Sequence, residues 1–125
     1  MAALLSRGFM SDPVYKICSS AALKEAKARG RFEGSADDAR DGFIHLSAKH
    51  QVPGTLSKYF SGQHDLVLLA VDPHQLGKSL RWEVSRGGEL FPHLYGHLDM
   101  THVISVATLE LQEDGSHRLP EGVAP

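Results

Sequence analysis

The feature that most constrains the fold is the run at 65–72, Asp-Leu-Val-Leu-Leu-Ala-Val-Asp. Every residue between its two acids is apolar, which makes it the clearest strand of the chain. A strand without alternation is covered on both of its faces, so we expect this one near the middle of a sheet. The rest of the chain must therefore supply neighbouring strands and covering helices.

Other stretches supply those elements. Residues 21–29 are expected to form a helix, because two serines that can cap it come before and a glycine, a typical C-terminal residue, comes after. A second helix is expected over 52–60, since its proline falls in a first turn. Further strands are expected at 14–18, 43–47, 80–84 and 103–111. Strands and helices that do not alternate strictly favour a compact α+β fold over a doubly wound sheet.

At 125 residues, the chain is long enough for one domain with a sizeable core. The signals of regular structure predict a single globular domain over 13–112, flanked by tails at 1–12 and 113–125. Met1 and Met10 both remain candidate starts. No apolar run is long enough to span a bilayer, and the first ten residues lack the core of a signal peptide. The sequence thus indicates a soluble, cytoplasmic protein.

Charge and cysteine content argue against several classes of site. The formal net charge of -2 argues against a broad basic surface for nucleic acid, although one or two donors suffice for the phosphates of a nucleotide. The lone cysteine, Cys18, allows no intramolecular disulfide and no multi-cysteine metal site. His93 and His97 have the spacing of zinc ligands on a helix, but Pro92 and Gly96 disfavour a long helix there. We therefore expect no bound metal.

Chemically useful side chains gather first in 41–47, Asp-Gly-Phe-Ile-His-Leu-Ser. The first two residues indicate a turn, and strand alternation after them places His45 and Ser47 on the same face. A short connection leads to the second helix, so Gln51 and Thr55 are expected to converge on the same place. The segment would then form the base of a ligand-binding pocket. The alternative is a half-exposed strand with a solvated histidine.

A second group lies in 91–97, Phe-Pro-His-Leu-Tyr-Gly-His, which its proline and glycine mark as a loop. His93 can transfer a proton or hydrogen-bond a ligand, and Tyr95 can stack on a ring and donate a hydrogen bond. The alternative is that the apolar residues of this loop simply cover the core.

The expected strand at 80–84 carries the third group. Glu83 follows Trp82, and an acid beside a tryptophan can have a raised pKa and act on a proton, or can hold a ribose hydroxyl. Equally, Glu83 can be a surface residue. Arg81 is a candidate to meet a phosphate. The chain contains no phosphate-binding glycine motif and no Gly-x-Ser-x-Gly elbow, which argues against Walker, Rossmann and serine-hydrolase sites.

Several of these motifs, in this order, resemble a known family: 41–47, Gln51 with Thr55, 65–69, 80–83 and 91–96. It is domain-of-unknown-function family 952, an uncharacterised bacterial family, and the resemblance covers about 14–111. The family is similar in fold to ADP-ribosyltransferases and RNA 2′-phosphotransferases. The resemblance therefore implies an α+β, ADP-ribosyltransferase-like split β-structure with flanking helices. It brings no established reaction.

The resemblance also implies roles for some residues. In that fold group, a histidine on an early strand, followed by a small hydroxyl residue, holds the nicotinamide-side ribose of NAD, and His45 and Ser47 match that position. A second histidine or a tyrosine, and in many members a late glutamate, complete the site. The candidates for these positions are His93, Tyr95 and Glu83. The usual late glutamate motif is not recognisable, because Glu110 lacks the expected acid or glutamine beside it.

Two hypotheses follow. The first is an enzyme-like site that binds NAD or an ADP-ribosylated substrate, with ADP-ribosyl or phosphoryl transfer as its reaction. Its catalytic residues would be His45, His93 and Glu83, and its ligand-binding residues Ser47, Gln51, Thr55, Arg81, Trp82 and Tyr95. The second is a non-catalytic module that binds a small metabolite or another protein through the same pocket. The many protonatable groups favour the first and the absent glutamate motif favours the second. The sequence leaves the ligand, the reaction and the oligomeric state open.

Overall fold

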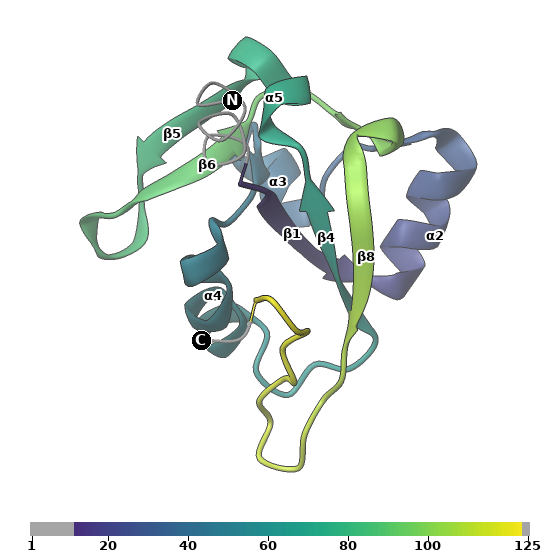
Figure 1. Cartoon of the computed structure of the whole chain (residues 1–125), viewed down its shortest axis with the longest axis vertical. Coiled ribbons are helices and arrows are strands. Elements are labelled where there is room, and N and C mark those ends of the chain that lie inside the picture. Colours follow the sequence, from purple (N-terminus) through teal and green to yellow (C-terminus); the bar gives the residue numbers. More distant parts are fainter. Residues whose placement is uncertain (1–11, 124–125) are drawn as a thin grey trace, which may run out of the picture.

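A computed structural model of the chain describes residues 12–123 (Figure 1). In this range the strands form three small antiparallel sheets, which helices flank. The first sheet has the strand order β1 (Val14–Ser19), β4 (Leu66–Val71), β8 (Val103–Leu109). The second pairs β2 (Arg31–Phe32) with β7 (Leu98–Asp99), and the third has the order β3 (Ile44–His45), β6 (Leu90–Leu94), β5 (Leu80–Val84). The predicted α+β class is confirmed at this level.

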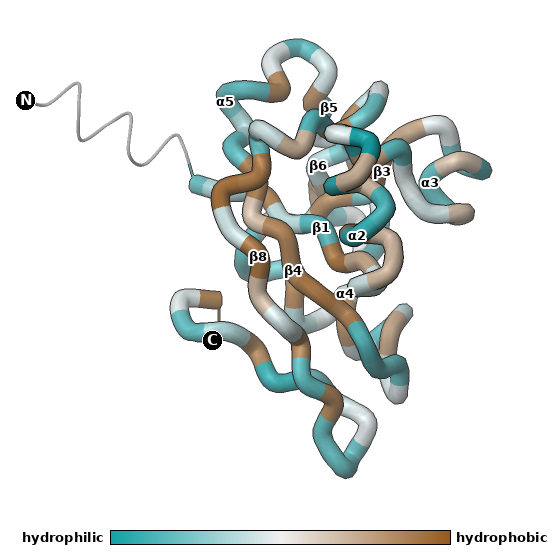
Figure 2. Tube along the Cα trace, turned by 90° about the vertical axis from the view of Figure 1, so that its right-hand side faces the viewer, coloured by the Kyte–Doolittle hydropathy of each residue, from teal (hydrophilic) through white to brown (hydrophobic). Residues whose placement is uncertain are grey.

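Strand β4 is the centre of the first sheet. All six of its residues are buried, and it pairs with β1 on one side and with β8 on the other. Figure 2 shows much of this strand as an apolar, brown segment. The prediction of a central strand covered on both faces is therefore confirmed.

Side chains alternate along β1 and β4, so the first sheet has an apolar core on each face. One core contains Val14 and Leu69, and it is completed by helix α2 (Ser20–Arg29) and by residues of β2, β3, β6 and β7. The other contains Ile17 and Leu68, and it is completed by helix α4 (Val52–Tyr59) and by residues near the C-terminus. The first sheet is thus the layer that holds the rest of the domain together.

Local signals explain the bounds of the two longer helices. The hydroxyl of Ser19 accepts a hydrogen bond from the backbone of Ala22 at 3.0 Å, and α2 ends at Gly30, whose φ of 84° is left-handed. Pro53 lies in the first turn of α4, where its missing amide donor costs nothing. Both predicted helices are confirmed to within one residue at each end.

Shorter elements complete the described range: helices α3 (Ala36–Asp41) and α5 (Pro73–Leu76), and the 3₁₀ turns Lys49–Gln51, Gly77–Ser79, Arg86–Gly88 and Met100–His102. Helix α3 begins with a capping box, because the side chains of Ser35 and Asp38 each accept a hydrogen bond from the backbone of the other. The helix ends at Gly42. The turn predicted at Asp41 and Gly42 is therefore the end of a helix.

Strand β6 replaces most of the loop that the sequence predicts for 91–97. Pro92 has no amide hydrogen, but its carbonyl accepts a hydrogen bond from the backbone of Leu46 at 3.0 Å, so the strand pairs in spite of the proline. Strand β3 is shorter than predicted, yet Ser47 beyond it exchanges two backbone hydrogen bonds with Tyr15 of β1, each of 2.8 Å. This bridge joins the third sheet to the first.

The C-terminal segment packs on the second core. The Nε2 atom of His117 lies 2.6 Å from the carbonyl oxygen of Gln63, and Val123 is buried. Residues 113–123, which the sequence predicts as a tail, therefore lie against the domain. The tail predicted at 1–12 falls outside the described residues, apart from its last residue. None of the described helices is long and apolar enough to cross a membrane.

Candidate functional site

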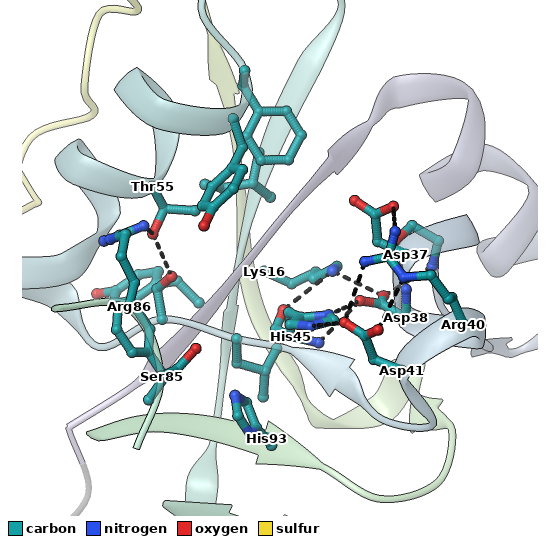
Figure 3. A pocket seen from close by; sticks show the side chains of 18 residues that line it. Lys16, Asp37, Asp38, Arg40, Asp41, His45, Thr55, Ser85, Arg86 and His93 are labelled. Atoms are coloured by element: carbon teal, nitrogen blue, oxygen red, sulfur yellow. Dashed lines mark hydrogen bonds and ion pairs between the residues drawn. The ribbon is translucent and has the colours of Figure 1, made fainter. Parts of the chain in front are cut away.

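A pocket of about 290 Å³ lies where β1, α3, β3, α4 and β6 come together (Figure 3). Figure 3 shows Arg86 and Thr55 on one side of it and Asp38, Asp41 and His45 on the other. The pocket also contains Ser47 and His93 in its lining. The lining thus contains both histidines and several hydroxyls, together with the charged side chains of Lys16, Asp37, Asp38, Arg40, Asp41 and Arg86.

A buried ion pair anchors the acidic side of the pocket. The Nζ atom of Lys16 donates to Asp38 Oδ2 at 2.9 Å and to the carbonyl oxygen of His45 at 3.1 Å. The side chains of Lys16 and Asp38 are only 6% and 2% exposed. Burial by itself raises the pKa of Asp38, but the charge of Lys16 and the hydrogen bonds from His45, Ser35 and Lys16 outweigh it, so this pKa lies below its ordinary value. Asp38 is therefore ionised at neutral pH.

The imidazole of His45 lies between two carboxylates. Its Nδ1 is 2.6 Å from Asp38 Oδ1, and its Nε2 is 2.9 Å from Asp41 Oδ2. The backbone amide of His45 also donates to Asp38 Oδ1, at 3.0 Å. Hydrogen bonds from Arg40, and a smaller contribution from His45, lower the pKa of Asp41. Both ring nitrogens of His45 are thus occupied.

The opposite side of the pocket presents hydroxyls and a guanidinium. The Oγ of Ser47 is 3.2 Å from Oγ1 of Thr55, which in turn accepts a hydrogen bond of 3.2 Å from Arg86. The guanidinium of Arg86 packs over the ring of Phe91 at 4.8 Å and lies 5.8 Å from the ring centre of Tyr59. These contacts hold the planar guanidinium in one orientation at the pocket wall.

His93 lies opposite His45 in the pairing of β3 with β6, and the two ring centres are 5.8 Å apart. The Nδ1 of His93 is 2.7 Å from Glu83 Oε1, and the phenol of Tyr95 donates to the same oxygen at 2.8 Å. Phe43 stacks on the imidazole of His93 at 4.0 Å. Strand β6 thus presents an imidazole that is backed by a carboxylate on the neighbouring strand.

The pKa of Glu83 is lowered, which corrects the sequence-based expectation of a raised pKa beside a tryptophan. The hydrogen bonds from His93 and Tyr95 stabilise the carboxylate of Glu83. The hydrogen bond between Tyr95 and Glu83 also raises the pKa of Tyr95. Trp82 is the neighbour of Glu83 in sequence but points to the other face of β5, where it is about half exposed. It therefore does not desolvate the acid.

Four of the predicted site residues line the pocket: His45, Ser47, Thr55 and His93. Five do not: Gln51, Arg81, Trp82, Glu83 and Tyr95. The amide of Gln51 has a structural role, because its Oε1 accepts from Ala48 at 2.8 Å and its Nε2 donates to the carbonyl of Leu90 at 2.7 Å. Arg81 lies over the ring of Tyr95 at 4.8 Å. Glu83 and Tyr95 reach the pocket only through their contact with His93.

Sequence reasoning missed Lys16, Asp38, Asp41 and Arg86. A signal existed for two of them: Lys16 is the one charged residue in the apolar run 14–18, and Ser35 with Asp38 has the spacing of a capping box. No local signal marked Arg86, because it follows a strand in a glycine-rich loop. Among residues 12–123, no group of three or more histidine, cysteine, aspartate or glutamate side chains is arranged to hold a metal ion.

Comparison with known proteins identifies relatives of this chain. Two solved structures of protein CC0527 from Caulobacter crescentus are similar to it. The crystal structure has a TM-score of 0.85 and 52% sequence identity, and the match covers 89% of this chain and 97% of the other. The solution NMR structure has a TM-score of 0.78 and 54% identity, covering 86% and 93%. No curated protein matches this chain.

A family model described as "Protein of unknown function (DUF952)" matches residues 17–106, which include every predicted site residue. The match spans most of the two larger sheets and all of α2, α3 and α4. This chain therefore belongs to the DUF952 family.

Proposed function

We propose that the protein binds NAD or a related ADP-ribosyl nucleotide in this pocket, with the ribose near His45 and a phosphate near Arg86. One observation carries the proposal: the Arg86 guanidinium lies with the hydroxyls of Ser47 and Thr55 on one side of a single pocket. The carboxylate–imidazole pair of Asp41 and His45 lies on the other side, where Arg40 contacts Asp41 (Figure 3). A ribose–phosphate ligand needs both sets of groups, because its phosphate takes donors and its ribose hydroxyls need acceptors.

Arg86 is suited to bind the phosphate. Its position over Phe91 and its hydrogen bond to Thr55 fix the plane of the guanidinium, and that bond uses only one of its five N–H donors. A planar fork of this kind matches two phosphate oxygens at once. The hydroxyls of Ser47 and Thr55 lie beside it and can donate to the same phosphate.

Asp41 is suited to bind the ribose. Its carboxylate is one-third exposed and contacts Nε2 of His45 at 2.9 Å. A ligand hydroxyl can therefore reach an oxygen of Asp41 from the pocket. This assignment keeps the sequence-based role of His45 in orienting a ribose, adds Asp41 as the acceptor, and moves Ser47 from the ribose to the phosphate beside Arg86.

The size of the pocket limits how much of a dinucleotide it encloses. Its volume of about 290 Å³ is at the lower end of the range of roughly 300–1,000 Å³ for small-molecule sites. We therefore propose that it encloses one ribose–phosphate unit and leaves the rest of the ligand at the mouth. Tyr59 lines the pocket and is 55% exposed, so its ring is available there to stack on a base.

The finer fold assignment belongs to the same proposal. An ADP-ribosyltransferase-like split β-structure is supported by two three-stranded sheets that are joined through the Tyr15–Ser47 bridge. In that fold group the positions that match His45 and Ser47 hold the nicotinamide-side ribose of NAD. The ribose orientation proposed here agrees with that arrangement at His45.

A non-catalytic module is the second candidate, and one observation favours it. Glu83, the carboxylate expected to take part in catalysis, lies outside the pocket lining and is hydrogen-bonded to His93 and Tyr95. In this case the same pocket binds a small metabolite without turning it over.

An NMR titration of the protein with NAD, ADP-ribose and a 2′-phosphorylated nucleotide tests the proposal. We expect shifts in residues 45–47 and in the resonances of Thr55 and Arg86, because these line the two sides of the pocket. Shifts spread over unrelated surfaces, or none at millimolar ligand, would reject the nucleotide. A nicotinamide-release assay on the protein that binds NAD then separates the enzyme from the binding module.

A further inference from the structure

We infer that His93, and not His45, is the general base of this site, and that Glu83 and Tyr95 position it. The inference rests on the nucleotide-binding function proposed above. It identifies the group that activates a water molecule for attack on the ribose of the bound ligand, and it gives a role to the cluster that lies behind the pocket.

His45 is not available as a base. Its two ring nitrogens are held by Asp38 and Asp41, at 2.6 and 2.9 Å. Each ring nitrogen already faces a carboxylate oxygen of the protein, so neither is left free to face a water molecule in the pocket. His45 therefore lies as a spacer between two carboxylates, and its contribution is to ligand binding.

His93 has the opposite arrangement, with one nitrogen bound and one free. Its Nδ1 contacts Glu83 at 2.7 Å, and no described residue forms a hydrogen bond with its Nε2. Among the described side-chain nitrogens and oxygens that are fully buried, only His102 Nδ1 lacks a hydrogen-bond partner. Nε2 of His93 also lacks a partner, so it is not fully buried and is open to the pocket that His93 lines. An accessible ring nitrogen without a protein partner is what a general base needs.

The strand order fixes the direction of that nitrogen. Glu83 lies on β5, which borders β6 on the side away from β3. The two nitrogens of an imidazole point away from each other, so the bond from Nδ1 to Glu83 directs Nε2 away from β5 and toward the pocket. The ring of Phe43, stacked on His93 at 4.0 Å with an interplanar angle of 25°, resists rotation of the imidazole.

Glu83 also fixes the tautomer of His93. The hydrogen bonds from His93 and Tyr95 keep Glu83 ionised, and an ionised carboxylate only accepts hydrogen bonds. In the neutral imidazole, Nδ1 therefore carries the proton and Nε2 has the lone pair. Tyr95 holds the carboxylate from its other side, at 2.8 Å. Both residues act through His93 and touch no part of the pocket themselves.

The step on NAD follows from this geometry. The oxygen of a water molecule forms a bond to the anomeric carbon of the nicotinamide ribose while the bond from that carbon to nicotinamide breaks. The electron pair of the broken bond returns to the nicotinamide nitrogen, and the proton of the water goes to Nε2 of His93. The products are ADP-ribose, nicotinamide and one proton, with nothing oxidised or reduced. The exposed carboxylate of Asp41 stabilises the positive charge that develops on the ribose.

The test begins with the intact protein, labelled with nitrogen-15 in its histidines, in a long-range proton–nitrogen correlation spectrum. We expect His93 to be protonated at Nδ1 and unprotonated at Nε2, and we expect Glu83→Ala to abolish that preference. Glu110→Gln, which removes an exposed carboxylate outside the pocket lining, should leave the His93 signals unchanged. Wild-type protein with the proton on Nε2 would overturn the inference whether or not any ligand binds.

Nicotinamide release from NAD is the second readout. His93→Gln should lower kcat by about 10²–10⁴-fold, and Glu83→Gln should lower kcat by a smaller factor, both with little change in KM. If Glu83 has only a structural role, Glu83→Gln should instead reduce the folded fraction of the protein, without a fall in kcat at nearly constant KM. If NAD binds and His93→Gln turns it over like wild type, or the wild type releases no nicotinamide, the base assignment is overturned and the binding function stands. If NAD does not bind, the proposed function itself fails.

Discussion

The side chain of Lys16 is buried in an apolar strand, and its ion pair with the carboxylate of Asp38 offsets the cost of that burial. Asp38 Oδ2 accepts from Lys16 at 2.9 Å, while Asp38 Oδ1 accepts from the backbone and ring of His45. A buried charge without a partner costs several kcal/mol, so this pair is needed for the fold as much as for the pocket. The ligand site is therefore built on a contact that also contributes to stability.

Asp38→Asn should destabilise the protein by about 3–5 kcal/mol, because it leaves the ammonium of Lys16 buried without a charged partner. Asp37→Asn is the matched control: that side chain is 73% exposed on the same helix, and its replacement should stay within about 0.5 kcal/mol of wild type. Urea unfolding measures both. Equal losses from the two variants would show that the buried pair is not the cause.

The effect of Asp38→Asn on stability should depend on pH. The folded-state pKa of Asp38 lies below its ordinary value of 3.8, so its contribution to stability is complete above that value. As the pH falls from 3.8 through the lower folded-state pKa, the contribution is lost, because the unfolded chain binds the proton first. The stability difference between wild type and Asp38→Asn should thus be constant from pH 7 to about 5 and shrink in more acidic solution. A difference that shrinks between pH 7 and 5 would contradict this account.

At the scale of elements, the short helix α3 delivers the acidic side of the pocket. Its capping box fixes Asp38, and its last residue is Asp41, so six residues place both carboxylates beside His45. Two glycines frame the helix. Gly34 has a φ of 108° and lies against Asp38, whereas Gly42 has a φ of 85° and open space around it.

Gly42→Ala should cost about 1–2 kcal/mol, the strain of a left-handed alanine. Gly34→Ala has a similar strain, and its added Cβ would lie 2.8 Å from the Cβ of Asp38, so overpacking should add about 1–3 kcal/mol. Urea unfolding of both variants measures the difference. A shift of the His45 amide resonance in Gly34→Ala alone would report the displaced carboxylate. If both variants lose the same stability, α3 tolerates displacement of Asp38.

Elements with their own local signal were predictable from the sequence, and elements held by distant partners were not. The apolar run of β4 and the caps of α2 are readable residue by residue. The pairing of β6 is not, because Pro92 looks like a strand breaker until neighbouring strands lie on both of its sides. Likewise, alternation places His45 and Ser47 on one face, but the role of Asp38 depends on Lys16, 22 residues earlier.

At the scale of the whole molecule, the pocket exists because the third sheet is attached to the first. The backbone pair of Tyr15 and Ser47 brings β3 against β1, and this places His45 close to Lys16. Arg86 then reaches the same pocket from the loop after β5, through Thr55 of α4. Segments that are far apart in the sequence thus contribute to one site, which is why its composition could not be derived from any single motif.

The most direct test of the nucleotide site compares two arginines by calorimetric titration with ADP-ribose. Arg86 lines the pocket beside Thr55, and Arg81 lies outside the pocket lining over the ring of Tyr95. If Arg86 binds the phosphate, Arg86→Gln should weaken binding by about 10–100-fold, the loss of a hydrogen-bonded charge. Arg81→Gln should leave the affinity within about twofold, since exposed charges away from the ligand contribute little. Equal effects of the two variants, or full affinity in Arg86→Gln, would contradict a ribose–phosphate ligand in this pocket.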